Sequence, residues 1–180
     1  MKHPTGTLVC LTALTLATGI APPARAADLT VTMLKATQDG TGATLGTIVV
    51  STSDAGAAFK LNLHGLPPGP HGFIVHSNAN CSPTFLNGVR IPAGAAGGPL
   101  DPDETYKHAG PAGDGYLGDL PVLTVSADGT ATETVVAPRI KDLAILKGHA
   151  LIIHIGGDTY SDSPSLMGGS GGRLACGLVE

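Results

Sequence analysis

Short stretches in which apolar and polar residues alternate run along most of the chain, and they predict β-strands. The clearest examples are Leu29 to Lys35 and Phe59 to Leu63. Further strand-like runs lie at 45–52, 73–76, 120–125, 132–136, 150–155 and 173–179. No long pattern with a helical period appears, and only a short helical turn is expected, at 142–146.

Turn signals separate these runs. They include Asp39-Gly40, Asp54-Ala55-Gly56, Pro67-Pro68-Gly69 and Asp128-Gly129. Short strands that are punctuated in this way are typical of an all-β antiparallel sandwich or barrel.

Two segments break the strand rhythm. Residues Asn78 to Asp119 show little strand pattern and are rich in Gly, Pro, Asn and Asp, and a second long loop runs from Gly156 to Gly172. Long loops in a compact domain are usually functional or disordered. We therefore expect any functional site where these two loops meet.

The first 26 residues have the pattern of a secretory signal peptide. Lys2 provides the positive start, Leu8 to Ile20 the apolar core, and Ala24-Arg25-Ala26 the cleavage signal. The alternative is a buried N-terminal helix. The signal peptide predicts one mature domain, residues 27–180, that is periplasmic or secreted, with no membrane span.

Cleavage changes the charge and the cysteine count. Loss of Lys2 and Arg25 leaves eight basic against fourteen acidic residues, a net charge of −6. No basic stretch is present, which argues against nucleic acid as a partner. Cys81 and Cys176 remain and are expected to form a disulfide in an oxidising compartment; free thiols or a thiolate metal site are the alternatives.

Several strings along the mature chain carry a family resemblance. They are HGFIVH at 71–76, AGGPLDP at 96–102, KHAGP at 107–111, GYLGDLP at 115–121, KGHALIIHIGGDTYSDSP at 147–164 and GGRLACG at 171–177. In this order and spacing the chain resembles the secreted bacterial copper/zinc superoxide dismutases. The resemblance implies an eight-stranded Greek-key β-barrel whose metal site lies outside the barrel, between two long loops.

The resemblance also assigns copper-ligand positions. The family holds copper with four histidines, and the matching positions here are Ile74, His76, Pro99 and His154. Two of the four are lost. Isoleucine and proline side chains offer no lone pair, and the family histidine at position 99 also bridges the two metals. What remains, His76 and His154, predicts at most a weak copper site.

The family zinc ligands match Pro99, His108, Tyr116 and Asp119, so only His108 and Asp119 remain. Structural zinc takes four ligands, so the sequence predicts that zinc is not bound. The resemblance further assigns Asp158 to hydrogen bonds that link a copper ligand to a zinc ligand. It assigns Arg173 to guiding superoxide, and Cys81 and Cys176 to the family disulfide.

Three functions follow from this pattern, and whether the chain is an enzyme stays open. The first is a secreted family member with a degenerate metal site, little or no dismutase activity and residual copper binding. The second is a working copper-dependent dismutase that converts superoxide to oxygen and hydrogen peroxide. The third is a metal-free barrel that binds a partner, in which the histidines only brace the loops. A homodimer is compatible with each.

Overall fold

The computed structural model describes residues 27–180, apart from the side chains of residues 166 and 167. The predicted signal peptide lies outside the described residues. No helix in this part of the chain has both the length and the apolar character needed to cross a membrane.

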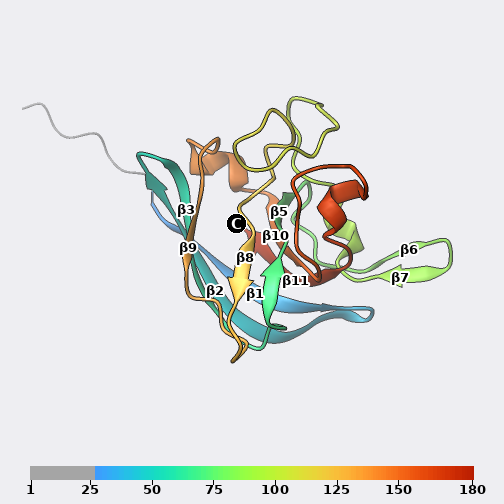
Figure 1. Cartoon of the computed structure of the whole chain (residues 1–180). Helices are drawn as coiled ribbons and strands as arrows, with labels where there is room; N and C mark the ends of the chain where they lie inside the picture. The colour runs from blue at the N-terminus through green and yellow to red at the C-terminus, as the bar shows by residue number, and fades with distance from the viewer. Residues whose placement is uncertain (1–26) are drawn as a thin grey trace, which may run out of the picture.

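Strands dominate the described chain, and its helices are short 3-10 turns. Seven strands form one strongly curled sheet in the order β5-β10-β11-β1-β2-β3-β9 (Figure 1). Their bounds are β1 Leu29–Thr37, β2 Gly40–Ser53, β3 Gly56–Leu63, β5 Phe73–His76, β9 Thr134–Ala137, β10 His149–His154 and β11 Arg173–Val179. A two-stranded sheet, β4 Gly69–His71 with β8 Leu123–Val125, faces the inside of the curl. The all-β prediction is confirmed.

The predicted count of eight barrel strands is recovered when β4 and β5 are taken as one interrupted strand. Gly72 separates them. Its N–H donates to Gly156 O at 2.7 Å and its carbonyl accepts from His154 N at 2.8 Å, so this residue is bonded to the loop and strand beside it. A Cβ at position 72 would lie 2.8 Å from the Cβ of Ser170, which explains why glycine is needed where the loop packs so closely.

Alternation along the strands builds the core. Buried residues such as Val31, Ile48, Phe59, Phe73 and Ile153 point into the curl and form one continuous cluster. The rings of Phe59 and Phe73 meet edge to face, with their centroids 5.6 Å apart. A second, smaller cluster lies on the opposite face under the long loop; it contains Ala36, Cys81, Ala93, Ala96, Ala150, Ile152 and Cys176.

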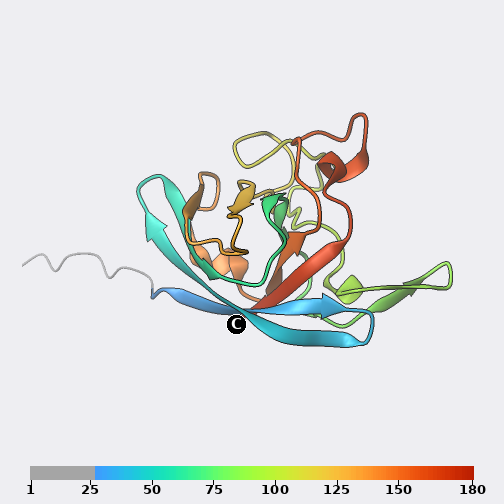
Figure 2. The same ribbon diagram turned by 60° about the horizontal axis from the view of Figure 1, so that its bottom comes forward.

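One expectation from the sequence is wrong in part. The segment 78–119 contains a β-hairpin, β6 Thr84–Leu86 and β7 Val89–Ile91, which projects away from the sheet in both views (Figures 1 and 2). Asn87 and Gly88 both have positive φ, 50° and 80°, as a tight two-residue hairpin turn requires. The apolar side chains of Phe85, Leu86 and Val89 are exposed there, and three-residue strands give too short an alternation to be recognised in the sequence.

The predicted helical turn and most strand boundaries are close to those observed, although β2 begins at Gly40, before the predicted run at 45–52. The turn at 142–146 is the 3-10 helix η2, Leu143–Leu146, and Asp142 caps it by accepting a hydrogen bond from Ala144 N at 2.9 Å. β8 starts at Leu123, later than predicted, because the N–H of Leu120 donates to Phe73 O outside any ladder.

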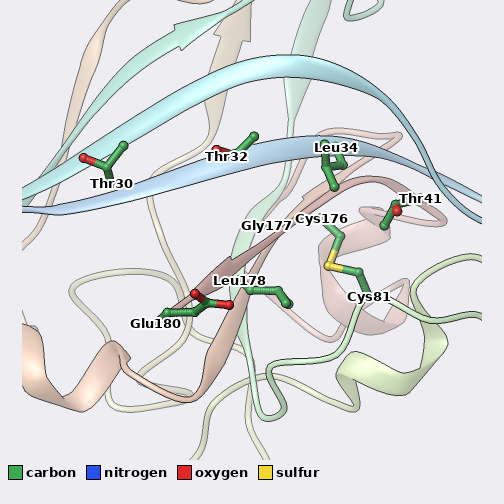
Figure 3. Close-up of a pocket in the computed structure, with 9 residues that line it drawn as sticks. All are labelled: Thr30, Thr32, Leu34, Thr41, Cys81, Cys176, Gly177, Leu178 and Glu180. Carbon is green, nitrogen blue, oxygen red and sulfur yellow. A yellow bond between two sulfur atoms is a disulfide. The ribbon is translucent and has the colours of Figure 1, made fainter.

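The predicted disulfide is present between Cys81 and Cys176, whose Cα atoms are 5.8 Å apart. It joins the start of the long loop to β11. Figure 3 shows it at one end of a groove of about 370 Å³ that also contains Thr30, Thr32 and the C-terminal Glu180. The bridge therefore fixes the loop that carries positions 93 to 99 against the strand that carries Arg173.

Candidate metal centre

The two long loops meet, as the sequence predicted. The N–H of His108 donates to Asp162 Oδ2 at 2.9 Å, and the N–H of Val122 donates to the Tyr160 hydroxyl at 2.8 Å. In Figures 1 and 2 these loops lie together on one side of the curled sheet, above the end of β10.

His76 and His154 come together at this junction. Each is the last residue of its strand, β5 and β10, and these strands are antiparallel neighbours. Their Nε2 atoms are 3.2 Å apart, their rings stack, and both side chains are buried. Residues 78 positions apart in the sequence thus present two ring nitrogens to the same point.

The outer hydrogen bonds of this pair fix its tautomers. His76 Nδ1 lies 2.8 Å from Gly97 O, and His154 Nδ1 lies 3.0 Å from Gly171 O. A carbonyl oxygen only accepts, so both Nδ1 atoms carry hydrogen and donate. In neutral rings both Nε2 atoms then carry lone pairs, and two lone pairs face each other with no donor between them.

The pair also resists protonation. Burial lowers the pKa of His76 to about 3, helped by the charges of His154 and Arg173. Burial lowers the pKa of His154 as well, with Arg173 adding to the effect. At neutral pH these are therefore two neutral nitrogen ligands that converge on one point, an arrangement that suits a metal ion.

The positions beside this pair offer no further ligand. Ile74, on the same face of β5 as His76, is fully buried and pairs with Ile152 of β10. Pro99 lies opposite His76 in an isolated β-bridge. Nowhere in the described chain do three or more His, Cys, Asp or Glu side chains gather in a way that could hold a metal ion.

Arg173 lines the same cavity as the two histidines. Its Nη1 donates to Ala93 O and its Nη2 to Gly97 O, each at 2.5 Å. Gly97 O therefore accepts from both Arg173 and His76 Nδ1. One carbonyl of the long loop fixes the orientation of both side chains.

His108, Asp119 and Asp158 form a separate buried unit. His108 Nδ1 is 2.9 Å from Asp119 Oδ1, and His108 Nε2 is 2.6 Å from Asp158 Oδ1. All three side chains are at most 1% exposed. Asp119 Oδ2 accepts from the backbone N–H groups of Ala109 and Gly110.

Two carboxylates can both accept from one imidazole only if both ring nitrogens carry protons. Burial by itself lowers the pKa of His108, but the hydrogen bonds and charges of Asp119 and Asp158 outweigh burial and raise it to about 10. The unit is therefore a charged imidazolium held between two carboxylates at neutral pH. Its ring lies near those of Tyr116 and Tyr160, with centroids 6.5 and 6.4 Å away.

Asp158 holds only one of the two partners that the resemblance assigns to it. It accepts from His108 Nε2 and, at 2.7 Å, from the N–H of Tyr160. Its expected second partner would stand at position 74, where isoleucine has no hydrogen-bonding atom.

Sequence reasoning missed three participants. Gly97 acts through its carbonyl, which no side-chain motif reveals. Asp162 accepts from His108 N, and Ser170 is a buried residue beside the histidines. The family resemblance covers DTYSD at 158–162, but it assigned a role to Asp158 alone.

Comparison with known proteins places this geometry in context. The family model "Copper/zinc superoxide dismutase (SODC)" matches residues 44–179. The superoxide dismutase [Cu-Zn] of Brucella abortus is 50% identical over 158 residues, 88% of this chain and 91% of that protein.

Two solved structures extend the comparison. The Brucella abortus enzyme superposes with a TM-score of 0.85 at 49% identity, covering 86% of this chain and all of that one. A SOD-like protein from Bacillus subtilis gives a TM-score of 0.66 at 30% identity, covering 84% and 97%. The chain therefore shares its fold with both of these proteins.

Proposed function

Since the chain belongs to the copper/zinc superoxide dismutase family, we propose that it is a divergent member whose dismutase activity is reduced or absent and which binds copper through His76 and His154. One observation carries this proposal. The Nε2 atoms of His76 and His154 lie 3.2 Å apart, each with a free lone pair, and the neighbouring positions are Ile74 and Pro99. The family normally binds copper and zinc, and the residues present differ in how well they fit each metal.

The histidine pair fits copper. Two nitrogens that are each about 2.0 Å from a tetrahedral ion lie about 3.3 Å apart, close to the observed 3.2 Å. Soft monovalent copper accepts a small number of nitrogen ligands, and copper binds imidazole more tightly than the other divalent first-row metals do. Bound copper would supply one-electron redox chemistry. The chain's own contribution is to hold both Nε2 atoms neutral and in place, through Gly97 O and Gly171 O.

The zinc positions do not fit a four-ligand ion. His108 already donates a hydrogen bond to Asp119, and the side chain of Pro99 has no ligand atom. Burial raises the pKa of Tyr116, with Asp162, Asp101 and Asp119 adding to the effect, so its phenol stays protonated and is a poor ligand. We therefore propose no role for zinc.

One solved relative offers a parallel for the proline at position 99. The Bacillus subtilis protein is described as SOD-like, and one of its solved variants carries histidine in place of a tyrosine and a proline. Pro99 in this chain is likewise a proline where the resemblance places a ligand. We propose that Arg173 attracts anions toward the cavity. The periplasmic or secreted location and the homodimer remain predictions.

A working copper-dependent dismutase is the second candidate, since the family relationship favours it equally. Stopped-flow superoxide decay separates the two. The protein, with its disulfide formed, is loaded with one equivalent of copper and freed of excess, and metal content is measured on the same sample. We expect stoichiometric copper, less than stoichiometric zinc and decay no faster than with free copper. Catalytic decay that disappears in His154→Ala would establish the enzyme instead.

A further inference from the structure

A second cavity, of about 340 Å³, opens beside the long loop, and its volume lies within the usual range for small-molecule pockets, about 300–1,000 Å³. It shares Pro99 with the cavity beside the histidine pair, but neither His76 nor His154 lines it. The lining of the second cavity includes Asp101, Glu104, Tyr106 and Tyr116. This cavity is therefore separate from the proposed copper site.

Tyrosine and proline give the second cavity an aromatic and apolar wall. Tyr106 is 75% exposed, so most of this residue is open to an occupant of the cavity. Pro99 and Tyr116 stand at two positions where the resemblance places zinc ligands. Their replacement therefore leaves apolar and aromatic surface where the family presents imidazole nitrogens.

Asp101 and Glu104 give the cavity its charge. The Asp101 carboxylate accepts hydrogen bonds from Thr105 N and Thr105 Oγ1, each at 3.0 Å, and from Tyr106 N at 2.8 Å. Burial opposes ionisation, but these hydrogen bonds outweigh it and lower the pKa of Asp101, so this carboxylate is ionised at neutral pH. The Glu104 side chain has no hydrogen-bond or ion-pair partner among the described residues. One fixed and one free carboxylate thus border the same space.

No basic side chain lines this cavity among the residues that the structure describes. The charge of Arg139 acts on Asp101, but the Nη1 of Arg139 donates to backbone carbonyls, at 2.8 Å to Gly115 O and at 3.1 Å to Tyr116 O. The two carboxylates therefore have no cationic partner within the cavity, which favours a positively charged occupant.

The wall decides which kind of cation fits. Calcium takes about six to eight oxygen ligands, far more than two carboxylates supply. The negative faces of tyrosine rings attract an organic ammonium ion, and aromatic cages bind quaternary ammonium groups in this way. The alkyl groups of such a cation also bury apolar surface against Pro99.

We propose that this cavity binds a small organic ammonium ion, with its charge beside Asp101 and Glu104 and its alkyl groups against Tyr106, Tyr116 and Pro99. The proposal goes beyond copper binding and does not require it. Copper content is measured on a separate sample, so failure of either proposal leaves the other standing.

The test is an NMR titration of metal-free protein of residues 27–180 with the disulfide formed, followed through the backbone amides of residues 104–106 and 116. The probe is choline. Its comparators are the neutral analogue with carbon in place of the quaternary nitrogen, which has the shape without the charge, and calcium, which has charge without alkyl groups. We expect saturable choline binding about tenfold or more tighter than either comparator, the combined size of two cation–π contacts.

Each other outcome of the titration overturns part of the proposal or all of it. Equal affinity for the neutral analogue overturns the role of the carboxylates. Calcium binding at these amides as tight as that of choline overturns the role of the aromatic wall. Absence of a saturable shift with choline overturns the proposal as a whole.

Variants at three exposed positions then test the residues. Tyr106→Leu removes one ring and should weaken choline binding by about threefold or more, whereas Tyr106→Phe keeps the ring and should retain binding. Glu104→Gln should weaken binding by about twofold to fivefold, as for an exposed ion pair. The matched control is Asp103→Asn, which removes an equal charge from a residue outside the lining and should leave binding unchanged. Unchanged binding in Tyr106→Leu would overturn the aromatic contact, and equal losses in Glu104→Gln and Asp103→Asn would show attraction to net charge alone.

Discussion

The resemblance predicts that each half of the candidate metal centre keeps two of four ligands, yet the two halves differ in their hydrogen bonding. Around His76 and His154 the lost ligands leave two lone pairs open and facing each other. Around His108 the remaining groups close on one another, because Asp119 and Asp158 each accept from a ring nitrogen. The first half presents two neutral ring nitrogens, and the second is an imidazolium held between two carboxylates.

The chemistry of the remaining groups explains the difference. Carboxylates beside an imidazole stabilise a proton on it, so in the His108 half a proton takes over the charge that a metal would supply. Two neutral imidazoles cannot do this, because burial and the charge of Arg173 oppose protonation. We therefore expect metal affinity where only histidines remain, and the structure shows a salt bridge where carboxylates remain.

The largest expected effect comes from restoring imidazoles around His76 and His154. The double variant Ile74→His and Pro99→His adds imidazoles on the strand face of His76 and opposite it. Loaded with copper, it should decompose superoxide about a hundredfold faster than the parent chain, a gain of about 2.7 kcal/mol in barrier. Stopped-flow decay measures this.

The matched control for that variant is Ile74→Asn and Pro99→Asn, which removes the same apolar groups without adding imidazole. It should gain nothing. Equal rates of superoxide decay in both double variants would show that removing the apolar groups, rather than adding copper ligands, raises the rate.

Substitutions in the two halves should differ by about two orders of magnitude in their effect on copper affinity. His76→Ala or His154→Ala removes half of the chelate and should weaken Cu(I) binding by about a hundredfold or more. His108→Ala should change it by less than about threefold, because its nitrogens are already bonded to carboxylates. Competition with a coloured Cu(I) chelator gives both constants. A comparable loss in His108→Ala would mean that the halves form one mixed site.

Stability should depend on the closed half. Asp119→Asn removes one partner of a fully buried charged pair and should lower the free energy of unfolding by about 3–5 kcal/mol. The control is Asp114→Asn in the same loop, whose ion pair with Lys107 is exposed and screened by solvent, so its loss should change stability little. Urea unfolding of the metal-free proteins measures both, and equal losses would contradict the assignment.

The pH dependence should have opposite signs in the two halves. The pKa of His108 is raised to about 10, so its contribution to stability is complete below about pH 6.5 and is lost as pH rises toward 10. The pKa of His76 is lowered to about 3, so the unfolded chain takes up the proton first, and stability falls as pH drops from about 6.5 toward 3.

Urea unfolding as a function of pH measures both limbs of this profile. His108→Gln should flatten the alkaline limb, and His76→Gln the acid limb. Each variant is the control for the other, so the alkaline limb should remain in His76→Gln. A single variant that flattened both limbs would show that the two halves titrate together.

The sequence by itself determined the strands and the surviving ligands. Period-two alternation placed His76 on the same face as Ile74 and opposite to Phe73 and Val75, because side-chain direction in a strand is a local property. Eight strands separated by Gly, Pro and Asp turns, a disulfide between Cys81 and Cys176, and the absence of imidazole at 74 and 99 were all readable in the letters. The short hairpin at 84–91 was not, since its strands are shorter than the alternation that would reveal them.

Only the tertiary structure decided what the surviving groups do. That His76 and His154 face each other with lone pairs depends on the carbonyls of Gly97 and Gly171, and backbone groups carry no sequence signature. That His108 is a fixed cation depends on two carboxylates brought from 11 and 50 residues away. Protonation state, tautomer and burial arise from contacts between distant segments, and so they follow from the fold rather than from any motif.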